Sequence, residues 1–160
     1  MKKIYLAYLA FGISLLVSCN KDDDPKVDPV VGVWDLENLT LEVKNNEAAA
    51  DTINGTYSPF QLFFITRLIL DIKQDKTFEQ EAVQVDGSKS SADGEWEKGE
   101  NTLTLNFDDG DVSEYSIVSN DEGELKLSFD DVLELPDPNF PDDETKSVEV
   151  EATFTFNYEK

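Results

Sequence analysis

The chain has 160 residues, a formal net charge of −22, no histidine and a single cysteine. These counts exclude a Ser-His-Asp triad, a Cys-His pair, histidine-based zinc sites and an intramolecular disulfide. The acidity disfavours binding to nucleic acid phosphates, whereas a content of 39% hydrophobic and 11% aromatic residues favours one folded domain over disorder.

The N-terminus has the pattern of a secretion signal. Two lysines precede an apolar stretch from Ile4 to Val17, which is shorter than the roughly 20 apolar residues of a membrane span. The run LVSC at 16–19 resembles a bacterial lipobox, whose cysteine receives fatty acyl chains such as palmitate. The resemblance implies a signal peptide at 1–18, lipid attachment at Cys19 and stable membrane anchoring, since two or more acyl chains hold firmly. A chance cysteine after an ordinary signal peptide is the alternative.

Residues 19–29 follow as an acidic, proline-containing segment with little to bury, so we predict a flexible tether. At its start, Asn20, Lys21, Asp22 and Asp23 resemble the export signal of certain gram-negative surface lipoproteins. That resemblance implies the outer membrane, with the domain exposed at the cell surface. The alternative is a generic polar spacer and a location on the periplasmic face.

From Val30 onward apolar residues recur mostly at every second position, which predicts strands in one domain over 30–160. The first strand, at about 31–44, changes face midway. Trp34 and Leu36 share one parity, whereas Leu39 begins the other. A β-bulge near Glu37-Asn38 would reconcile the two halves.

The segment 59–66 is ambiguous. Phe60, Phe63 and Phe64 fit a short helix that plugs one barrel end, whereas a strand running on into Leu68 is the alternative. Long acidic loops are expected at 45–56 and 130–145.

Four tight turns follow, and their registers can be predicted because directly opposed residues share a face of the sheet. In the turn at Asp108-Asp109-Gly110, Gly110 takes the left-handed conformation. The rule predicts these opposed pairs: Ile72 with Phe78, Trp96 with Leu103, Gly94 with Leu105, Leu103 with Tyr115, Leu105 with Ser113, Ile117 with Leu125, and Tyr115 with Leu127.

The last strand, at about 146–158, alternates apolar residues with polar ones from Val148 to Tyr158, as expected for a sheet with one solvated face. A meander of antiparallel strands leaves two raw edges unless its ends meet. We therefore predict an all-β, eight-stranded antiparallel up-and-down barrel in which the last strand pairs with the first.

Several short motifs resemble lipocalin-type barrels. Gly32-Val33-Trp34 is similar to the G-x-W motif that opens their first strand, and Gly32 and Trp34 are the residues this implies as structural. The run DKTF at 75–78 resembles a D-G-T-F hairpin of bacterial lipocalin-like lipoproteins, with Lys76 in place of the usual glycine. The runs GEW at 94–96 and NTLTL at 101–105 resemble the next hairpin. The resemblance spans residues 30–158 and implies a lipocalin-like fold, without the later motifs of animal lipocalins.

Catalytic signatures are missing from the sequence: there is no G-x-S-x-G, P-loop or dinucleotide fingerprint. A carboxylate-only glycosidase remains chemically possible, but no enzyme and no cofactor are predicted. Acidic loops at 108–111 and 137–144 are interpreted as solvated turns rather than calcium sites. We expect a non-enzymatic binding module for a small apolar ligand. The alternative is a filled lumen, with the loops contacting a glycan or protein at the cell surface.

Overall fold

The computed structural model describes residues 27–46, 49, 51, 53–121, 123–136 and 147–160. The predicted signal peptide, lipid-attachment site and export signal lie outside these residues. The described elements, in chain order, are β1 (Gly32–Val43), β2 (Gly55–Tyr57), α2 (Pro59–Phe63), β3 (Ile65–Ile72), β4 (Thr77–Gln84), β5 (Lys89–Lys98), β6 (Thr102–Phe107), β7 (Val112–Asp121), β8 (Glu124–Pro136) and β9 (Ser147–Glu159).

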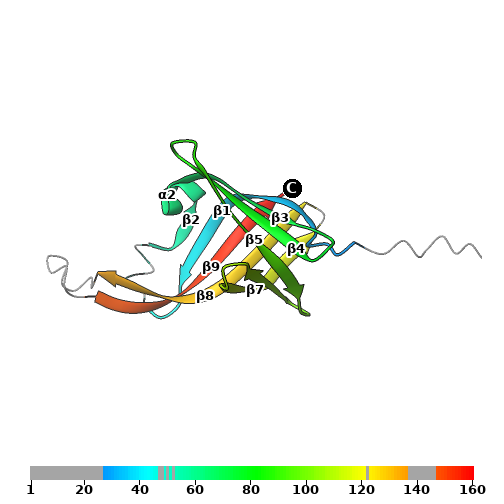
Figure 1. The fold of residues 1–160 in the computed structure, drawn as a ribbon. Helices are drawn as coiled ribbons and strands as arrows, with labels where there is room; N and C mark the ends of the chain where they lie inside the picture. The colour runs from blue at the N-terminus through cyan, green and yellow to red at the C-terminus, as the bar shows by residue number, and fades with distance from the viewer. Residues whose placement is uncertain (1–26, 47–48, 50, 52, 122, 137–146) are drawn as a thin grey trace, which may run out of the picture.

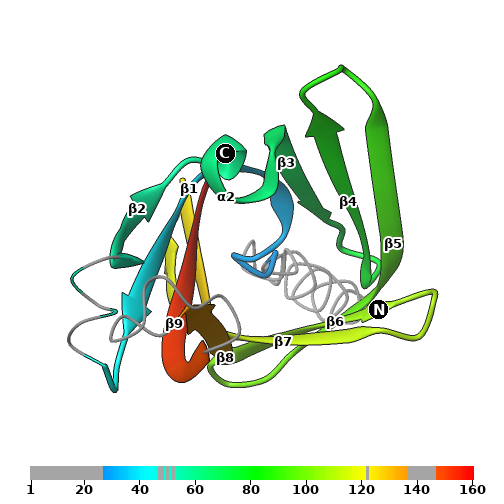
Figure 2. The ribbon, with the colours of Figure 1, turned by 90° about the vertical axis from the view of Figure 1, so that its left-hand side faces the viewer.

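Eight antiparallel strands form a closed barrel (Figure 1). Each strand from β3 to β9 pairs with the next, and β1 pairs with both β3 and β9, so the sheet has no free end. Figure 2 shows these strands arranged as a ring. The predicted eight-stranded up-and-down barrel is confirmed. The three-residue strand β2 is an addition, which pairs with β1 from Leu39 to Leu41 beyond the reach of β3.

Several local predictions are confirmed. The β1–β9 register shifts between Leu36 and Asn38, which is the predicted bulge, and it brings Leu39 to the same face as Leu36. Ile72 lies opposite Phe78. Leu103 lies opposite Tyr115, and the connecting turn places Gly110 at a φ of 99°.

The predicted register of β5 with β6 is wrong by two residues: Trp96 lies opposite Leu105, and Gly94 lies opposite Phe107. A shift of two residues leaves every side chain on its face, so parity does not distinguish the registers. The Gly99 N–H donates to the Thr102 carbonyl at 2.9 Å, which encloses a two-residue turn.

The predicted register of β7 with β8 is also wrong. Ile117 lies opposite Leu127 rather than Leu125, because the register shifts between Ile117 and Ser119. The extra residue, Val118, is 59% exposed. The aromatic ring of Tyr115 accordingly lies beside that of Phe129, with 5.9 Å between centroids, instead of opposite Leu127.

The helix predicted within 59–66 is confirmed as α2, but the predicted plug is wrong. Phe60, Phe63 and Phe64 are 50%, 44% and 69% exposed. Figures 1 and 2 show α2 beside β2 and β3 rather than across the barrel. The Gln61 side-chain oxygen accepts a hydrogen bond from the Ser58 backbone N–H at 2.8 Å, and Phe64 ends the helix at a φ of 55°.

The predicted loop at 130–145 begins later than expected. Residues 130–136 of β8 pair with residues 147–153 of β9, beyond the last β7–β8 pair at Ser116 and Ser128. We call this projection the β8–β9 ribbon (Figure 1); β1 still pairs with its first residues, Ala152 and Thr153, and not with the rest. Its inner face carries Leu133 opposite Val150, so alternation of apolar residues outweighed the acidic character of the segment.

Two apolar clusters form the core. The larger fills the barrel end that carries the turns at 73–76 and 98–101, which we call the closed end. Trp34 and Trp96 are buried there, and their indole N–H groups donate to the carbonyls of Val30 and Lys73 at 2.7 and 2.8 Å. The second cluster lies toward the opposite, open end and comprises Leu39, Leu41, Val43, Ala49, Val150 and Ala152.

Candidate functional site: the open half of the barrel

The inner face of the open half carries a set of aromatic side chains. Alternation and strand register place them on the same face as the buried leucines of β6 and β8. They are Phe107, Tyr115, Phe129, Phe154 and Phe156, and all are half-buried. Inward residues of the closed end, such as Trp34 and Leu125, are completely buried. Solvent therefore reaches these five rings, whereas Leu39, Val150 and Ala152, which also lie toward the open end, are completely buried.

Four of these rings, Tyr115, Phe129, Phe154 and Phe156, pack against one another as an aromatic wall on β7, β8 and β9. Phe129 stacks on Phe154 with 4.9 Å between centroids and 6° between planes. Tyr115 meets Phe129 and Phe156 edge-on, at 5.9 and 6.1 Å. Both geometries are favourable for aromatic pairs, so the wall is ordered by its own contacts.

The strands β4 and β5 contribute a different wall. Gln80 lies opposite Leu70 and Ala92, while Ala82 lies opposite Leu68 and Ser90. The pairing with buried leucines puts these amide, hydroxyl and small side chains on the inner face. An occupant of the lumen would therefore contact rings on one side and hydrogen-bonding or small groups on the other.

The two inner-face phenols stay protonated at neutral pH. Burial raises the pKa of Tyr115, and a hydrogen bond with Ser113 offsets part of that rise. Burial also raises the pKa of Tyr158, and the charge of Tyr115 adds to the rise. Both groups are consequently neutral hydrogen-bonding groups rather than bases.

The barrel wall has unequal height around the open end. On one side of the β6–β7 hairpin, β5 residues 89–93 pair with β4 but extend past β6. On the other side, the β8–β9 ribbon extends past β7. The rim is therefore lowest at the turn 108–111.

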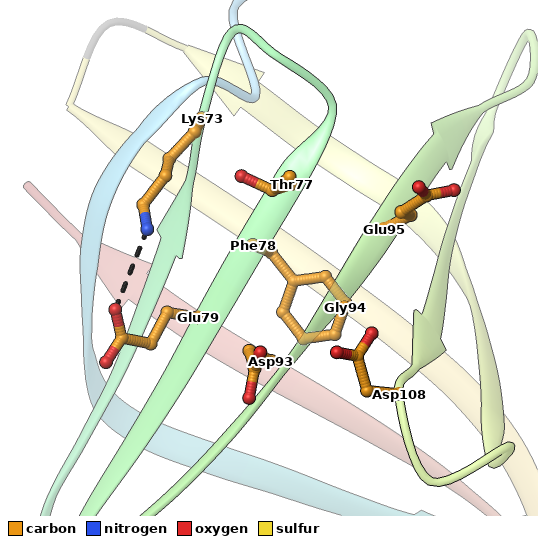
Figure 3. Close-up of a pocket in the computed structure, with 8 residues that line it drawn as sticks. All are labelled: Lys73, Thr77, Phe78, Glu79, Asp93, Gly94, Glu95 and Asp108. Atoms are coloured by element: carbon orange, nitrogen blue, oxygen red, sulfur yellow. Dashed lines mark ion pairs between the residues drawn. The ribbon is translucent and has the colours of Figure 1, made fainter.

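The hollow drawn in Figure 3, of about 580 Å³, lies on the outer surface of β4 and β5 and is acidic rather than apolar. Its one cation, Lys73, forms an ion pair with Glu79 at 3.6 Å. Among the described residues, no group of three or more histidine, cysteine, aspartate or glutamate side chains is placed to hold a metal ion. In the turn 108–111, Asp109 accepts a hydrogen bond from the Asp111 N–H at 3.1 Å.

The structure places the predicted structural residues at the closed end, away from the aromatic wall. Gly32 begins β1, and a Cβ atom at this position would lie 2.7 Å from the Cε atom of Lys160. Trp34 is buried beneath Val30. Cys19, and Asn20 to Asp23 after it, lie outside the described residues.

Sequence reasoning missed the aromatic wall as a specific set, and missed Asp131. A signal was present, because Leu125, Leu127, Phe129, Asp131 and Leu133 alternate without interruption. The acidic residues between them led to the interpretation of a loop.

No helix among the described residues has the length and apolar character to cross a membrane. No protein-family model and no curated protein matches the chain.

Among solved structures, the chain is similar to a lipocalin-like protein from Bacteroides uniformis, with 9% identity, a TM-score of 0.50, and coverage of 83% of this chain and 99% of that one. It is also similar to a protein from Bacteroides eggerthii, with 8% identity, a TM-score of 0.47, and coverage of 81% and 98%. For lobster apocrustacyanin A1 the identity is 18%, the TM-score 0.44, and the coverage 88% and 65%. The first similarity shows the fold: this chain is a lipocalin-like barrel.

Proposed function

We propose that the chain is a lipid-anchored envelope protein whose barrel binds a small apolar ligand and performs no catalysis. The observation that supports this proposal is the half-buried state of the inward rings from Phe107 to Phe156, beside a completely packed closed end. A barrel filled throughout would bury them as it buries Trp34. Aromatic side chains with a few polar groups are the usual lining of a small-molecule site.

The absence of catalysis is proposed from the lining. Among the described inner-face positions only Lys98 and Asp131 carry charge, and Lys98 is held by Asp28 at the closed end, at 2.8 Å. General acid–base chemistry needs titratable groups positioned together on a substrate. This lumen offers one carboxylate and neutral phenols.

Native mass spectrometry of the protein extracted from its own membranes tests ligand binding. We expect a fraction that carries an additional small-molecule mass, and we expect Phe154→Ala to reduce that fraction by removing one half of the Phe129–Phe154 stack. Phe63→Ala, on the exterior of α2, is the matched control and should leave the fraction unchanged. A single ligand-free mass that does not shift on adding lipids or apolar compounds would refute ligand binding.

The proposed anchor is tested by Cys19→Ser. Without the thiol no acyl chain can be attached, so the protein should leave the membrane fraction and lose incorporation of labelled palmitate. Ser18→Ala, which preserves the cysteine, should keep both. A Cys19→Ser protein that remains membrane-bound would refute the lipid anchor.

We propose the outer face of the outer membrane as the location. Replacing Lys21, Asp22 and Asp23 together with alanine should protect the barrel from protease added to intact cells, because the export signal is removed. Equal digestion of the wild type and the triple variant would dismiss this location in favour of a generic spacer.

A second candidate function is contact with a glycan or protein at the cell surface. The observation favouring it is the exposed group of Phe60, Phe63 and Phe64, in which the rings of Phe60 and Phe64 meet edge-on at 6.3 Å. Replacing all three with serine should abolish binding to a glycan array, while the ligand-loaded mass stays. Loss of the loaded mass in this variant would assign the rings to ligand binding instead.

A further inference from the structure

The short helix α2 exposes three phenylalanine side chains on the outside of the barrel. Phe60, Phe63 and Phe64 are 50%, 44% and 69% exposed, and the rings of Phe60 and Phe64 meet edge-on at 6.3 Å. Phe64 ends the helix at a φ of 55°, a left-handed conformation that a bulky residue rarely adopts. A group of exposed apolar side chains marks a surface that contacts a partner or a membrane.

These rings lie in a stretch of the sequence that carries no acidic residue. No aspartate or glutamate occurs from residue 52 to residue 70, whereas every other interval between acidic residues from Asp22 onward holds at most seven residues. The stretch has a single charge, on Arg67, whose Nε donates to Asp35 Oδ2 at 2.6 Å. A chain with a net charge of −22 is repelled by anionic lipid headgroups, so this surface can approach a membrane more closely than the acidic remainder.

Several polar groups beside the rings already bond to one another. Gln61 Oε1 accepts hydrogen bonds from the backbone N–H and the hydroxyl of Ser58, at 2.8 and 3.1 Å. The Phe64 N–H donates to the Phe60 carbonyl at 3.1 Å. The hydroxyl groups of a glycan would lose hydrogen bonds with water here and gain few in return, whereas lipid hydrocarbon needs none. These contacts favour a membrane over a glycan as the partner of the rings.

A chain held at Cys19 can bring these rings to the membrane. Residues 19–26 precede the first described residue, and eight extended residues span up to about 27 Å. The barrel begins at the closed end with Gly32, which lies opposite Ile72 at the end of β3. Helix α2 directly precedes the other end of β3, and a strand of this length spans about 26 Å. The tether is therefore long enough for the barrel to lie on its side.

We infer that Phe60, Phe63 and Phe64 insert into the surface of the lipid bilayer that carries the anchor, so that the barrel lies with β3 toward the membrane. This inference rests on the proposed function, because the acyl chains supply attachment and the rings set only the orientation. In the ring of eight strands β7 lies four places from β3, so β7 and the low rim at 108–111 face solvent (Figure 2). A ligand can then enter the open end from solution.

Quenching of tryptophan fluorescence by brominated phosphatidylcholine tests the insertion, because bromine quenches only fluorophores that it contacts closely. The full lipidated chain with Phe60→Trp is reconstituted into phosphatidylcholine vesicles, and the wild type, in which Trp34 and Trp96 are buried, supplies the background. We expect brominated lipid to lower the fluorescence of the added tryptophan at least about twofold. Val112→Trp is the matched control, because Val112 is 63% exposed on β7, and its fluorescence should not change.

Replacing Phe63 and Phe64 with serine in the Phe60→Trp chain should reduce the quenching by about half or more, because two of the three apolar side chains are lost. Val118→Ser in the same background removes an exposed apolar side chain from the opposite side of the barrel and should leave the quenching unchanged. Near-ultraviolet circular dichroism verifies that each variant is folded.

The outcomes are distinguishable. Equal quenching at positions 60 and 112, in chains that float with the vesicles, would overturn the insertion while the anchor stands. Chains that do not float with the vesicles would refute the proposed anchor and this inference with it. An unquenched tryptophan at position 60, together with loss of glycan-array binding in the triple serine variant, would assign the rings to the second candidate function.

Discussion

At the scale of single residues, Gly94 determines how β5 and β6 meet. A Cβ atom at this position would lie 2.0 Å from the backbone oxygen of Asn106 and 2.9 Å from the Cα of Phe107. Backbone atoms cannot swing aside, so we expect Gly94→Ala to lower the free energy of unfolding by about 3 kcal/mol. Urea denaturation measures this.

Gly123→Ala is the matched control for that experiment. No heavy atom lies within 4 Å of the Cβ position at Gly123, so the change should stay within about 0.5 kcal/mol. Equal effects of the two substitutions would show that the β5–β6 strands can separate at Gly94 without cost.

The phenols of Tyr115 and Tyr158 predict a loss of stability at alkaline pH. Burial raises both pKa values above the ordinary value of 10. The fold favours the neutral forms, so their contribution is complete below pH 10 and is lost as the pH rises toward the folded pKa values. The free energy of unfolding should therefore fall above about pH 10. The double variant Tyr115→Phe and Tyr158→Phe should show a shallower decline, and an identical decline would contradict this assignment.

Sequence patterns predict residues of this kind only in part. The glycine at 94 was evident as part of a motif, but the atoms it must avoid belong to β6, and their position depends on a register that parity cannot fix. In the same way, strain at Lys76, whose φ is 73°, could be foreseen because the D-G-T-F hairpin that this turn resembles has glycine there. The position of the Lys76 ammonium over the Trp96 ring could not be foreseen.

At the scale of elements, the bulge in β1 joins two halves whose apolar residues would otherwise face opposite ways. Deleting Glu37 removes the extra residue, so Leu39, Leu41 and Val43 would turn from the core to solvent. We expect the deletion to abolish cooperative thermal unfolding, measured by near-ultraviolet circular dichroism. Glu37→Ala keeps the residue count and should unfold cooperatively within a few degrees of the wild type. A deletion variant with native-like unfolding would mean that the bulge can be lost without turning the strand over.

Most strands could be predicted because apolar alternation is local, and the first and last strands lie within a residue or two of the expected bounds. The β8–β9 ribbon could not, because Asp130, Asp131 and Pro136 indicate a loop until Leu133 and Leu135 are seen opposite Val150 and Val148. The bulge at Val118 was missed for a similar reason: nothing in the flanking residues marks the interruption.

At the scale of the whole molecule, the negative charge opposes compaction. Six ion pairs among the described residues, mostly exposed, each contribute roughly 0–1 kcal/mol to the free energy of unfolding. The excess acidic side chains behind the net charge of −22 repel one another and lower that free energy. Raising sodium chloride from about 0.02 M to about 0.5 M screens the repulsion and should raise the melting temperature. A fall in the melting temperature would show that the ion pairs outweigh the repulsion.

The uneven rim leaves one low side at the open end of the barrel. The wall is lowest at residues 108–111, between the longer β4–β5 hairpin and the β8–β9 ribbon. The proposed ligand could therefore place one end against the aromatic wall while its other end leaves the barrel over residues 108–111. Under the proposed function, a ligand longer than the lumen would be bound by one end only. The barrel would then select ligands by the chemical group at the bound end and accept varied groups at the exposed end.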